Sequence, residues 1–242
     1  MKIIEMSERR TSGIAILASL WVTVVVWALA AFIVVPVAGA QDADKDVAFR
    51  WAFGALTGQG NDRRLEAVTQ DRVLRTGEKI KMFLEPGRMC FVYVIHHNSQ
   101  DEVSLLFPYD LGQFDRDYAV SGKYYIPRGQ SWYELDRNPG TEAFHVIASF
   151  QRLPELERLL GEMDRAGGPR KAELSKMVLS EIRSQKKQHR ELAAPAERPV
   201  NIGGAVRGLE KSTAGGYPDV AVMAQEITAN GFYARTFTIE HQ

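Results

Sequence analysis

Cys90-Phe91-Val92-Tyr93-Val94-Ile95 is apolar at every position and runs directly into His96-His97. Successive side chains of a strand point to opposite faces, so a strand of this composition has to be covered on both sides. We therefore expect Phe91 to Ile95 to be a central strand that is covered on each side. Cys90 is the only cysteine of the chain. It excludes an intramolecular disulfide, and we expect it to be a small buried side chain.

Shorter strands are expected on either side of this run. Val47, Phe49, Trp51 and Phe53 alternate with smaller or polar residues, which is the period of a half-buried strand. Further strands are expected at 80–84, 103–107, 124–126, 132–135 and 144–150. Gly, Pro, Asn and Asp stand between these segments, and a series of short strands of this kind favours an antiparallel sandwich or barrel.

The pattern changes to helical spacing after the strands. One helix is predicted from Leu153 to Arg165 and a second from about Lys171 to Leu192. The expected buried stripes are Leu153, Leu156, Leu159, Leu160 and Met163 in the first helix, and Leu174, Met177, Val178 and Ile182 in the second. Lys186, Lys187, His189 and Arg190 suit the negative end of the second helix. We favour a solvated helix end over a binding patch for this basic cluster, because charge runs usually solvate a face.

Two closing strands are predicted at Val220 to Ile227 and Arg235 to His241. The expected fold is mainly β with a helical extension (α+β). It has an antiparallel β-sandwich or barrel-like core, two helices after the core, and C-terminal strands that return to the sheet.

The N-terminal segment is typical of an export signal. No charged residue occurs from Thr11 to Gln41, whereas Arg9 and Arg10 stand directly before this stretch. The apolar run ends in Ala38-Gly39-Ala40, which has the small-x-small pattern of a signal-peptide cleavage site. A basic flank, an apolar core and such a cleavage site are the parts of a secretory signal peptide, so we expect cleavage after Ala40.

An uncleaved membrane anchor is the alternative. Apolar cores of signal peptides have about 7–15 residues, whereas a spanning helix needs about 20, and Ile14 to Val35 is long enough to span. Pro36 favours cleavage because it ends the helix before the predicted cleavage site. In either case residues 41–242 are expected outside the cytoplasm, in the periplasm or at the outer face of the inner membrane.

The expected organisation is a signal peptide or anchor at 1–40, a β-rich core at 41–152, a helical extension at 153–194, and a loop with closing strands of the same domain at 195–242. The whole chain has no formal net charge, and its first 40 residues contain three cations and two anions. The exported part therefore has a net charge near −1. Charge and compartment together argue against nucleic acid as a partner.

An ordered series of short motifs resembles a known family. The series is Leu74 to Lys81, Cys90 to Ile95, Leu105 to Pro108, Tyr124 to Pro127, Trp132 to Leu135 and Gly140 to Ser149. In order and spacing it resembles a bacterial cell-envelope family, number 4384 among the domains of unknown function, over about residues 72–165. The C-terminal Arg235-Thr236-Phe237-Thr238-Ile239-Glu240-His241 is similar to the tail of a longer branch of that family. The resemblance implies an exported β-rich domain, and it provides no catalytic residues.

No set of residues in the sequence meets the requirements of a catalytic or metal site. Glu142 has no visible partner, so we expect it to make a structural hydrogen bond or salt bridge. His96 and His97 are adjacent on a strand, point to opposite faces and cannot readily bind one metal. The chain contains no Gly-x-Ser-x-Gly elbow. We expect no cofactor, and a non-catalytic protein is favoured over an enzyme.

Aromatic residues provide the better candidates for binding. Tyr124, Tyr125, Trp132 and Tyr133 lie in a region rich in glycine. Exposed aromatics on a rigid β scaffold are common anchors for partners. The sequence leaves two alternatives open, since these rings can also pack under the loop, and the helix pair at 153–192 can present the docking face.

The function favoured by the sequence is a binding or scaffold module for a protein or an envelope component, with membrane contact through residues 14–35 if that segment is uncleaved. The second candidate is a periplasmic hydrolase whose site only the fold assembles. A catalytic pocket requires convergent polar groups, whereas a docking face requires exposed aromatics.

Overall fold

The computed structural model describes residues 46–88, 90–192 and 217–242, within a compact unit formed by Asp42–Gln242. The predicted export segment at 1–40 and the predicted span at 14–35 lie outside the described residues, as does the segment 193–216. In the described part of the chain, no helix is long and apolar enough to cross a membrane.

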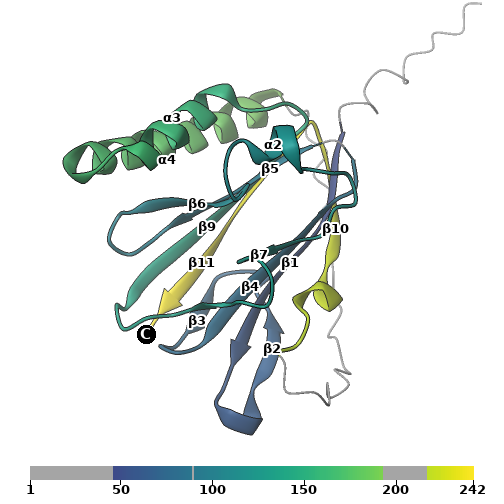
Figure 1. The fold of residues 1–242 in the computed structure, drawn as a ribbon, viewed down its shortest axis with the longest axis vertical. Helices are drawn as coiled ribbons and strands as arrows, with labels where there is room; N and C mark the ends of the chain where they lie inside the picture. Colours follow the sequence, from purple (N-terminus) through teal and green to yellow (C-terminus); the bar gives the residue numbers. More distant parts are fainter. Residues whose placement is uncertain (1–45, 89, 193–216) are drawn as a thin grey trace, which may run out of the picture. The chain divides into compact units, whose positions relative to one another are not determined.

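Two β-sheets form the centre of this unit (Figure 1). The six-stranded sheet has the order β10-β1-β4-β7, with β2 paired to β1 and β8 paired to β4. Its strands are β1 (Asp46–Thr57), β2 (Arg64–Ala67), β4 (Lys79–Pro86), β7 (Tyr124–Ile126), β8 (Tyr133–Glu134) and β10 (Gln225–Asn230). Short 3-10 turns, η2 (Gly60–Asp62) and η3 (Val220–Met223), flank these strands.

The five-stranded sheet has the order β3-β11-β9-β5-β6. Its strands are β3 (Arg72–Leu74), β5 (Phe91–His97), β6 (Val103–Phe107), β9 (Gly140–Ser149) and β11 (Phe232–His241). The pairs within the described residues are antiparallel except β3 with β11. This confirms the predicted mainly β fold, in which the C-terminal strands β10 and β11 return to the two sheets.

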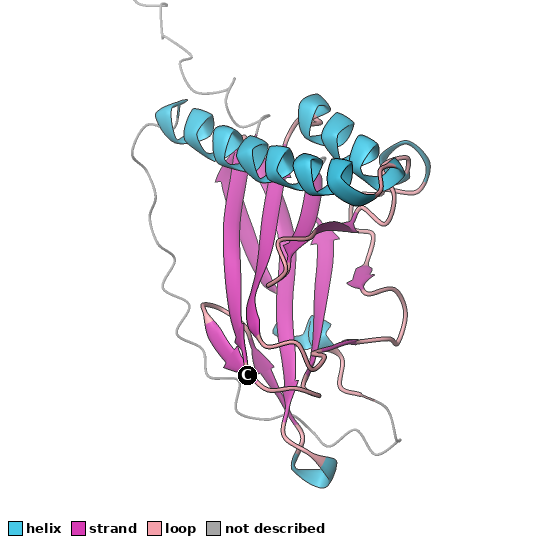
Figure 2. Ribbon diagram, turned by 90° about the vertical axis from the view of Figure 1, so that its left-hand side faces the viewer, coloured by secondary structure: helices cyan, strands magenta, loops and turns pink. Residues whose placement is uncertain are grey.

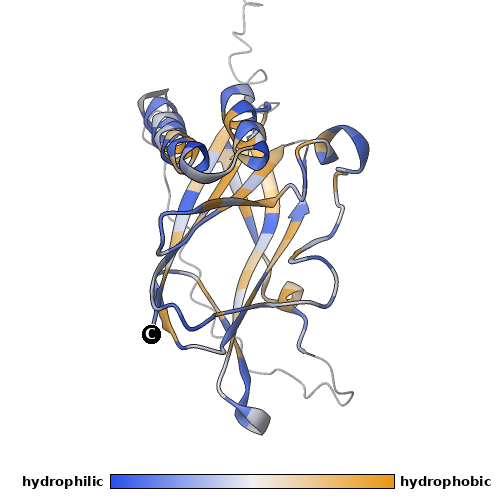
Figure 3. Cartoon of the chain, turned by 60° about the vertical axis from the view of Figure 1, so that its left-hand side comes forward, coloured by the Kyte–Doolittle hydropathy of each residue, from blue (hydrophilic) through white to orange (hydrophobic). Residues whose placement is uncertain are grey.

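Alternation along the strands builds the core between the sheets. Trp51 and Phe53 of β1 face the same way and are 5% and 3% exposed. The ring of Phe53 lies 5.1 Å from Phe144 of β9 and 5.6 Å from Phe237 of β11, both in edge-to-face geometry. Three rings from three strands therefore join the two sheets, and Figure 3 shows the hydrophobic residues concentrated along the strands.

Two helices cover the outer face of the five-stranded sheet: α3 (Pro154–Arg165) and α4 (Gly168–Leu192). Figure 2 shows α4 crossing the strands. Buried side chains of both helices pack in one cluster with Tyr93, Ile95 and Ile147 of the sheet. The prediction that β5 is covered on both sides is confirmed, because Val92 to Ile95 are fully buried. In the sheet, β5 lies between β9 and β6.

The structure also differs from the sequence prediction: β2, β3 and α2 were not predicted, and β9 begins before the predicted position 144. Three further differences have a clear physical reason. Met177 is 38% exposed, because the buried stripe of α4 follows the i, i+4, i+8 positions Leu174, Val178 and Ile182. The helix starts at Gly168, earlier than predicted, because Pro169 is tolerated in a first helical turn. Residues 220–223 form η3 in place of a strand, since the Oδ1 of Asp219 accepts a hydrogen bond from the Ala221 N–H (2.9 Å) and starts a turn.

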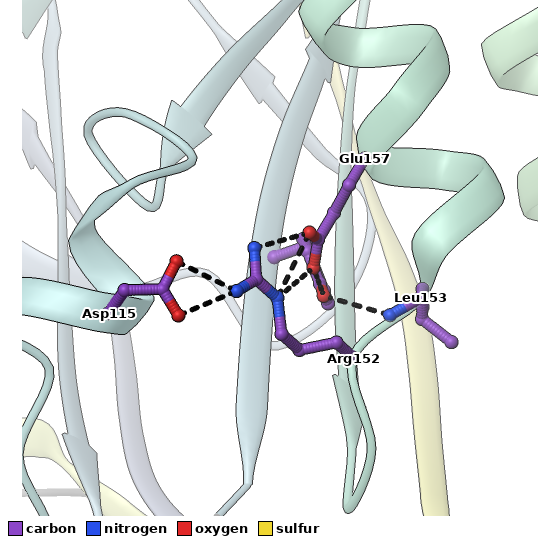
Figure 4. A network of polar contacts seen from close by, with 5 residues as sticks. Asp115, Arg152, Leu153 and Glu157 are labelled. Atoms are coloured by element: carbon purple, nitrogen blue, oxygen red, sulfur yellow. Dashed lines mark hydrogen bonds and ion pairs between the residues drawn. The ribbon is translucent and has the colours of Figure 1, made fainter.

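A polar network fixes the start of α3 on the sheet (Figure 4). The hydroxyl of buried Tyr93 donates to Glu157 (2.5 Å) and accepts from the Leu153 N–H (3.1 Å). Arg152 donates to Glu157 at 2.6–3.0 Å and to Asp115 at 2.8 and 2.9 Å. Asp115 belongs to the short helix α2 (Gln113–Arg116), so the network ties α2, β5 and α3 together.

Candidate functional site

A pocket of about 310 Å³ lies between the two sheets, and we refer to it as the intersheet pocket. Ile80 of β4 and Tyr133 of β8 line it from the six-stranded sheet, and Phe144 of β9 lines it from the other sheet. The remaining lining residues are His96, Asn98, Ser99, Gln100, Glu102, Leu106, Glu134, Leu135, Asp136, Asn138, Glu142 and His241. Polar side chains from both sheets and from two loops therefore converge on one cavity.

His96 and Glu142 form a pair on the wall of this pocket. The Nε2 of His96 lies 2.5 Å from the Oε2 of Glu142, and the imidazole stacks on Phe144 at 4.7 Å. The two polar side chains are 24% and 12% exposed. The β5–β9 register places His96 opposite Phe144, on the face that Val92 and Val94 use for the inner core.

The chemistry of the pair follows from this geometry. Burial lowers the pKa of His96, and the hydrogen bond and charge of Glu142 oppose that shift. An ionised carboxylate can only accept, so Nε2 of the neutral imidazole donates to Glu142 and Nδ1 retains a lone pair. The pair therefore offers a ligand an acceptor nitrogen and a carboxylate.

Sequence analysis found no partner for Glu142, and the structure provides one 46 residues away along the chain. His97 points to the other face of β5 and pairs with Asp101 (3.1 Å), which confirms that the adjacent histidines diverge. No three histidine, cysteine, aspartate or glutamate side chains in the described ranges are grouped so that they could hold a metal ion.

Carboxylates dominate the charge of the pocket lining. Glu102, Glu134, Asp136 and Glu142 line it, and no lysine or arginine belongs to its described lining. Glu134 pairs with Lys79, and the pKa of Glu134 is lowered by that contact. Hydrogen bonds from Asn138 to Asp136 (2.7 and 2.9 Å) lower the pKa of Asp136. These contacts stabilise the ionised forms of Glu134 and Asp136. Lys79 offsets the charge of Glu134, whereas Asn138 is neutral and leaves the charge of Asp136 uncompensated.

The loop between β5 and β6 forms one edge of the pocket and is held by a close contact. The Oδ1 of Asn98 accepts from the backbone N–H of Gln100 (3.0 Å) and of Glu102 (2.8 Å). Gly140, at the start of β9, has φ +148, and a Cβ built there would lie 2.4 Å from the Cβ of Ser99. Glycine is therefore required at this position for its conformation and for the approach of the loop.

Gly140→Ala is expected to lower the free energy of unfolding by about 1–3 kcal/mol, since it adds a steric clash to a strained backbone. Gly129→Ala is the matched control, because Gly129 has φ +67 but nothing lies within 4 Å of the added carbon. Urea unfolding of both variants measures the difference. Equal losses would show that Ser99 moves aside freely and that the loop is not held by this contact.

The four aromatic residues predicted to form a binding surface divide between two faces of the six-stranded sheet. Tyr124 and Tyr133 pack against the inner core. Tyr125 packs with Phe83 on the outer face, and Trp132 lies on that face near Lys81. Adjacent strand residues point to opposite faces, so the four rings form no single patch. All four are partly buried, and Tyr133 is the one that lines the intersheet pocket.

Sequence analysis did not single out Lys81, whose side chain is enclosed on the outer face. The residue is 4% exposed, and its ammonium donates to the carbonyls of Pro127 (3.4 Å), Gly129 (2.7 Å) and Ser131 (2.5 Å). It also lies 5.5 Å from the ring of Tyr125. Burial lowers the pKa of Lys81, and Asp219 opposes that shift. All three donors of the ammonium are used, so this lysine holds the loop between β7 and β8 in place.

The fold and the pocket define a β-sandwich domain with an acidic cavity between its sheets. Residues 73–152 match the family model described as "Domain of unknown function (DUF4384)", which confirms the resemblance found in the sequence. The matched segment contains every residue that lines the intersheet pocket except His241. No curated protein and no solved structure is significantly similar to the chain.

Proposed function

We propose that this protein is an exported, non-catalytic binding module of the bacterial cell envelope, and that its intersheet pocket binds a cationic side chain of a protein partner. The observation that carries the proposal is a cavity of about 310 Å³ whose described lining holds four carboxylates and no lysine or arginine, although Lys79 pairs with one of them, Glu134, from outside the lining. Such a cavity attracts an ammonium or guanidinium group.

The details of the pocket suit such a group. Glu142 and the Nδ1 lone pair of His96 accept hydrogen bonds, which an ammonium or guanidinium group donates. The rings of Phe144 and Tyr133 line the cavity and offer apolar contact to the stem that carries the cation. The volume is that of a small-ligand site, large enough for one side chain and too small for a folded element.

Glu142→Gln is expected to weaken binding of a lysine or arginine probe by about 10–100-fold, because a hydrogen bond to a charged group contributes about 1.5–3 kcal/mol. Isothermal titration of the full chain with N-acetyl-lysine methylamide and N-acetyl-arginine methylamide measures the affinity. The norleucine analogue, which lacks the charge, is the ligand control and is expected not to bind.

The matched control variant is Glu155→Gln, which removes the same charge from an exposed position on α3 (side chain 53% exposed). It is expected to leave the affinity within about twofold, since an exposed charge far from a site contributes little. The proposal is wrong if no cationic probe binds saturably, or if the two variants weaken binding equally.

One observation favours a second candidate, a hydrolase. A histidine with a carboxylate partner in a pocket is the arrangement of a general base, which could activate water through Nδ1. In that case His96→Gln abolishes hydrolysis of a supplied peptide or ester by the full chain. A protein that binds the cationic probes and turns over none of these substrates is a binding module.

A further inference from the structure

Four cations lie on one face of α4, on the opposite side of the five-stranded sheet from the intersheet pocket. Arg183, Lys186, Lys187 and Arg190 have the spacing i, i+3, i+4 and i+7, which places them side by side along the helix. A surface hollow of about 370 Å³ lies over them, and these four side chains are its described lining. We refer to this set as the α4 basic face.

The basic face connects to the sheet through a chain of polar contacts. The ammonium of Lys186 donates to the Oγ1 of Thr236 (2.7 Å), and that oxygen lies 3.0 Å from the Nδ1 of His145. Burial lowers the pKa of Lys186. Burial, followed by the charge of Lys186, lowers the pKa of His145 to about 4, so the imidazole is neutral at physiological pH.

Two features are unusual for a solvated helix end. Among the side chains that the structure describes, which end at Arg190 in α4, no carboxylate lies within ion-pair distance of Arg183, Lys186 or Arg190. Over the same residues the Nε2 of His145 is buried without a hydrogen-bond partner, and a buried polar atom left in this way costs free energy. Positive charge and an unsatisfied ring nitrogen therefore lie next to each other under α4.

We propose that the α4 basic face binds a phosphate group. Arginine presents a planar fork that matches phosphate oxygens, and lysine adds a compact charge to the same site. Arg183 and Arg190 are exposed at the two ends of the set, with the two lysines between them. This arrangement can hold one tetrahedral anion from several directions. The negative end of the helix opposes an anion, so several cations are needed to hold it there.

The chemistry is shared by two sources, a free phosphate and the headgroup of an anionic lipid. Binding of the full chain, kept in a nonionic detergent, is measured by isothermal titration with inorganic pyrophosphate and with dihexanoyl-phosphatidylglycerol. Dihexanoyl-phosphatidylcholine, whose phosphate is neutralised by its own ammonium, is the lipid control. Saturable binding of pyrophosphate supports a free-phosphate site, and binding of phosphatidylglycerol alone supports a lipid headgroup site.

The test variant is the double substitution Arg183→Gln/Arg190→Gln, which is expected to weaken binding by at least about tenfold. The matched control is Lys171→Gln/Lys176→Gln, which removes two exposed charges from the same helix outside the basic face and is expected to change affinity by less than about twofold. Circular dichroism verifies that α4 is retained in both.

Equal weakening by the two double variants would show attraction to the net charge of the helix and would overturn the proposal. The absence of saturable binding to either anionic probe would overturn it as well. Neither outcome bears on the intersheet pocket. Glu142 and His145 lie on opposite faces of β9, and the variants of α4 leave the pocket lining unchanged.

Discussion

Phe53→Ala is expected to lower the free energy of unfolding by about 3–5 kcal/mol, the usual cost of truncating a buried phenylalanine. The ring is 3% exposed and contacts the rings of both Phe144 and Phe237. Its loss removes apolar burial, leaves a cavity between the sheets and breaks two edge-to-face contacts, each of which contributes about 0.5–1.5 kcal/mol. The effect is large because β1 belongs to one sheet, whereas β9 and β11 belong to the other.

Urea unfolding followed by near-ultraviolet circular dichroism measures this loss, and the slope of the transition shows whether both sheets unfold together. Val222→Ala is the control, since Val222 is 59% exposed and its truncation is expected to cost less than about 0.5 kcal/mol. A cost below about 1 kcal/mol for Phe53→Ala would mean that the two sheets do not depend on this aromatic cluster.

The sequence pattern predicted several strands well, because each side chain of a strand faces one side of the sheet and its polarity reflects that side. Val103 to Phe107 and Tyr124 to Ile126 form strands with the predicted ends, and each is followed by a proline that cannot extend a sheet interior. Gly77 and Gly140, which stand before the strands β4 and β9 or at their start, have φ +85 and +148, a conformation that glycine adopts without a steric cost.

The starts of η3 and α4 were less well predicted, although the sequence contains residues that are typical of a helix start at both places. Asp219 directly precedes η3, and an aspartate before a turn is a common N-cap. Pro169 stands in the first turn of α4, where its missing N–H has no cost. In both cases the spacing of the apolar residues predicted the wrong start or the wrong type of element, whereas the single residue at the start indicated the right one.

The intersheet pocket could not be predicted from the sequence, because its residues come together only in the fold. Strand parity alone places His96 on the face of Val94, and Glu142 on the face of Phe144. Parity does not tell which strands are neighbours, however, and the contact depends on β5 pairing with β9 in one register. The aromatic residues did not require the fold, because Tyr124 and Tyr125 are adjacent on β7 and parity alone places them on opposite faces.

Glu157→Ala is expected to lower the free energy of unfolding by about 2–4 kcal/mol, because it leaves charged and hydroxyl groups without their partner. Glu157 is 12% exposed, accepts from the hydroxyl of fully buried Tyr93, and pairs with Arg152. The hydrogen bonds that Arg152 donates to Glu157 and Asp115 raise the pKa of Arg152, so Arg152 stays charged after the substitution and retains only Asp115. Thermal and urea unfolding of the full chain measure the loss.

A double-mutant cycle separates the Tyr93–Glu157 contact from general damage to the helix. Tyr93→Phe alone leaves the Leu153 N–H without its acceptor, so it also destabilises, by about 1–3 kcal/mol. If the hydrogen bond couples the two residues, the double variant costs less than the sum of the single ones by about 0.5–3 kcal/mol. Glu155→Ala, on the same helical turn but exposed, controls for the loss of a carboxylate near the helix start and is expected to cost less than about 1 kcal/mol. Additive losses would mean that α3 is held by its apolar stripe alone, and that the network only fixes the position of α2.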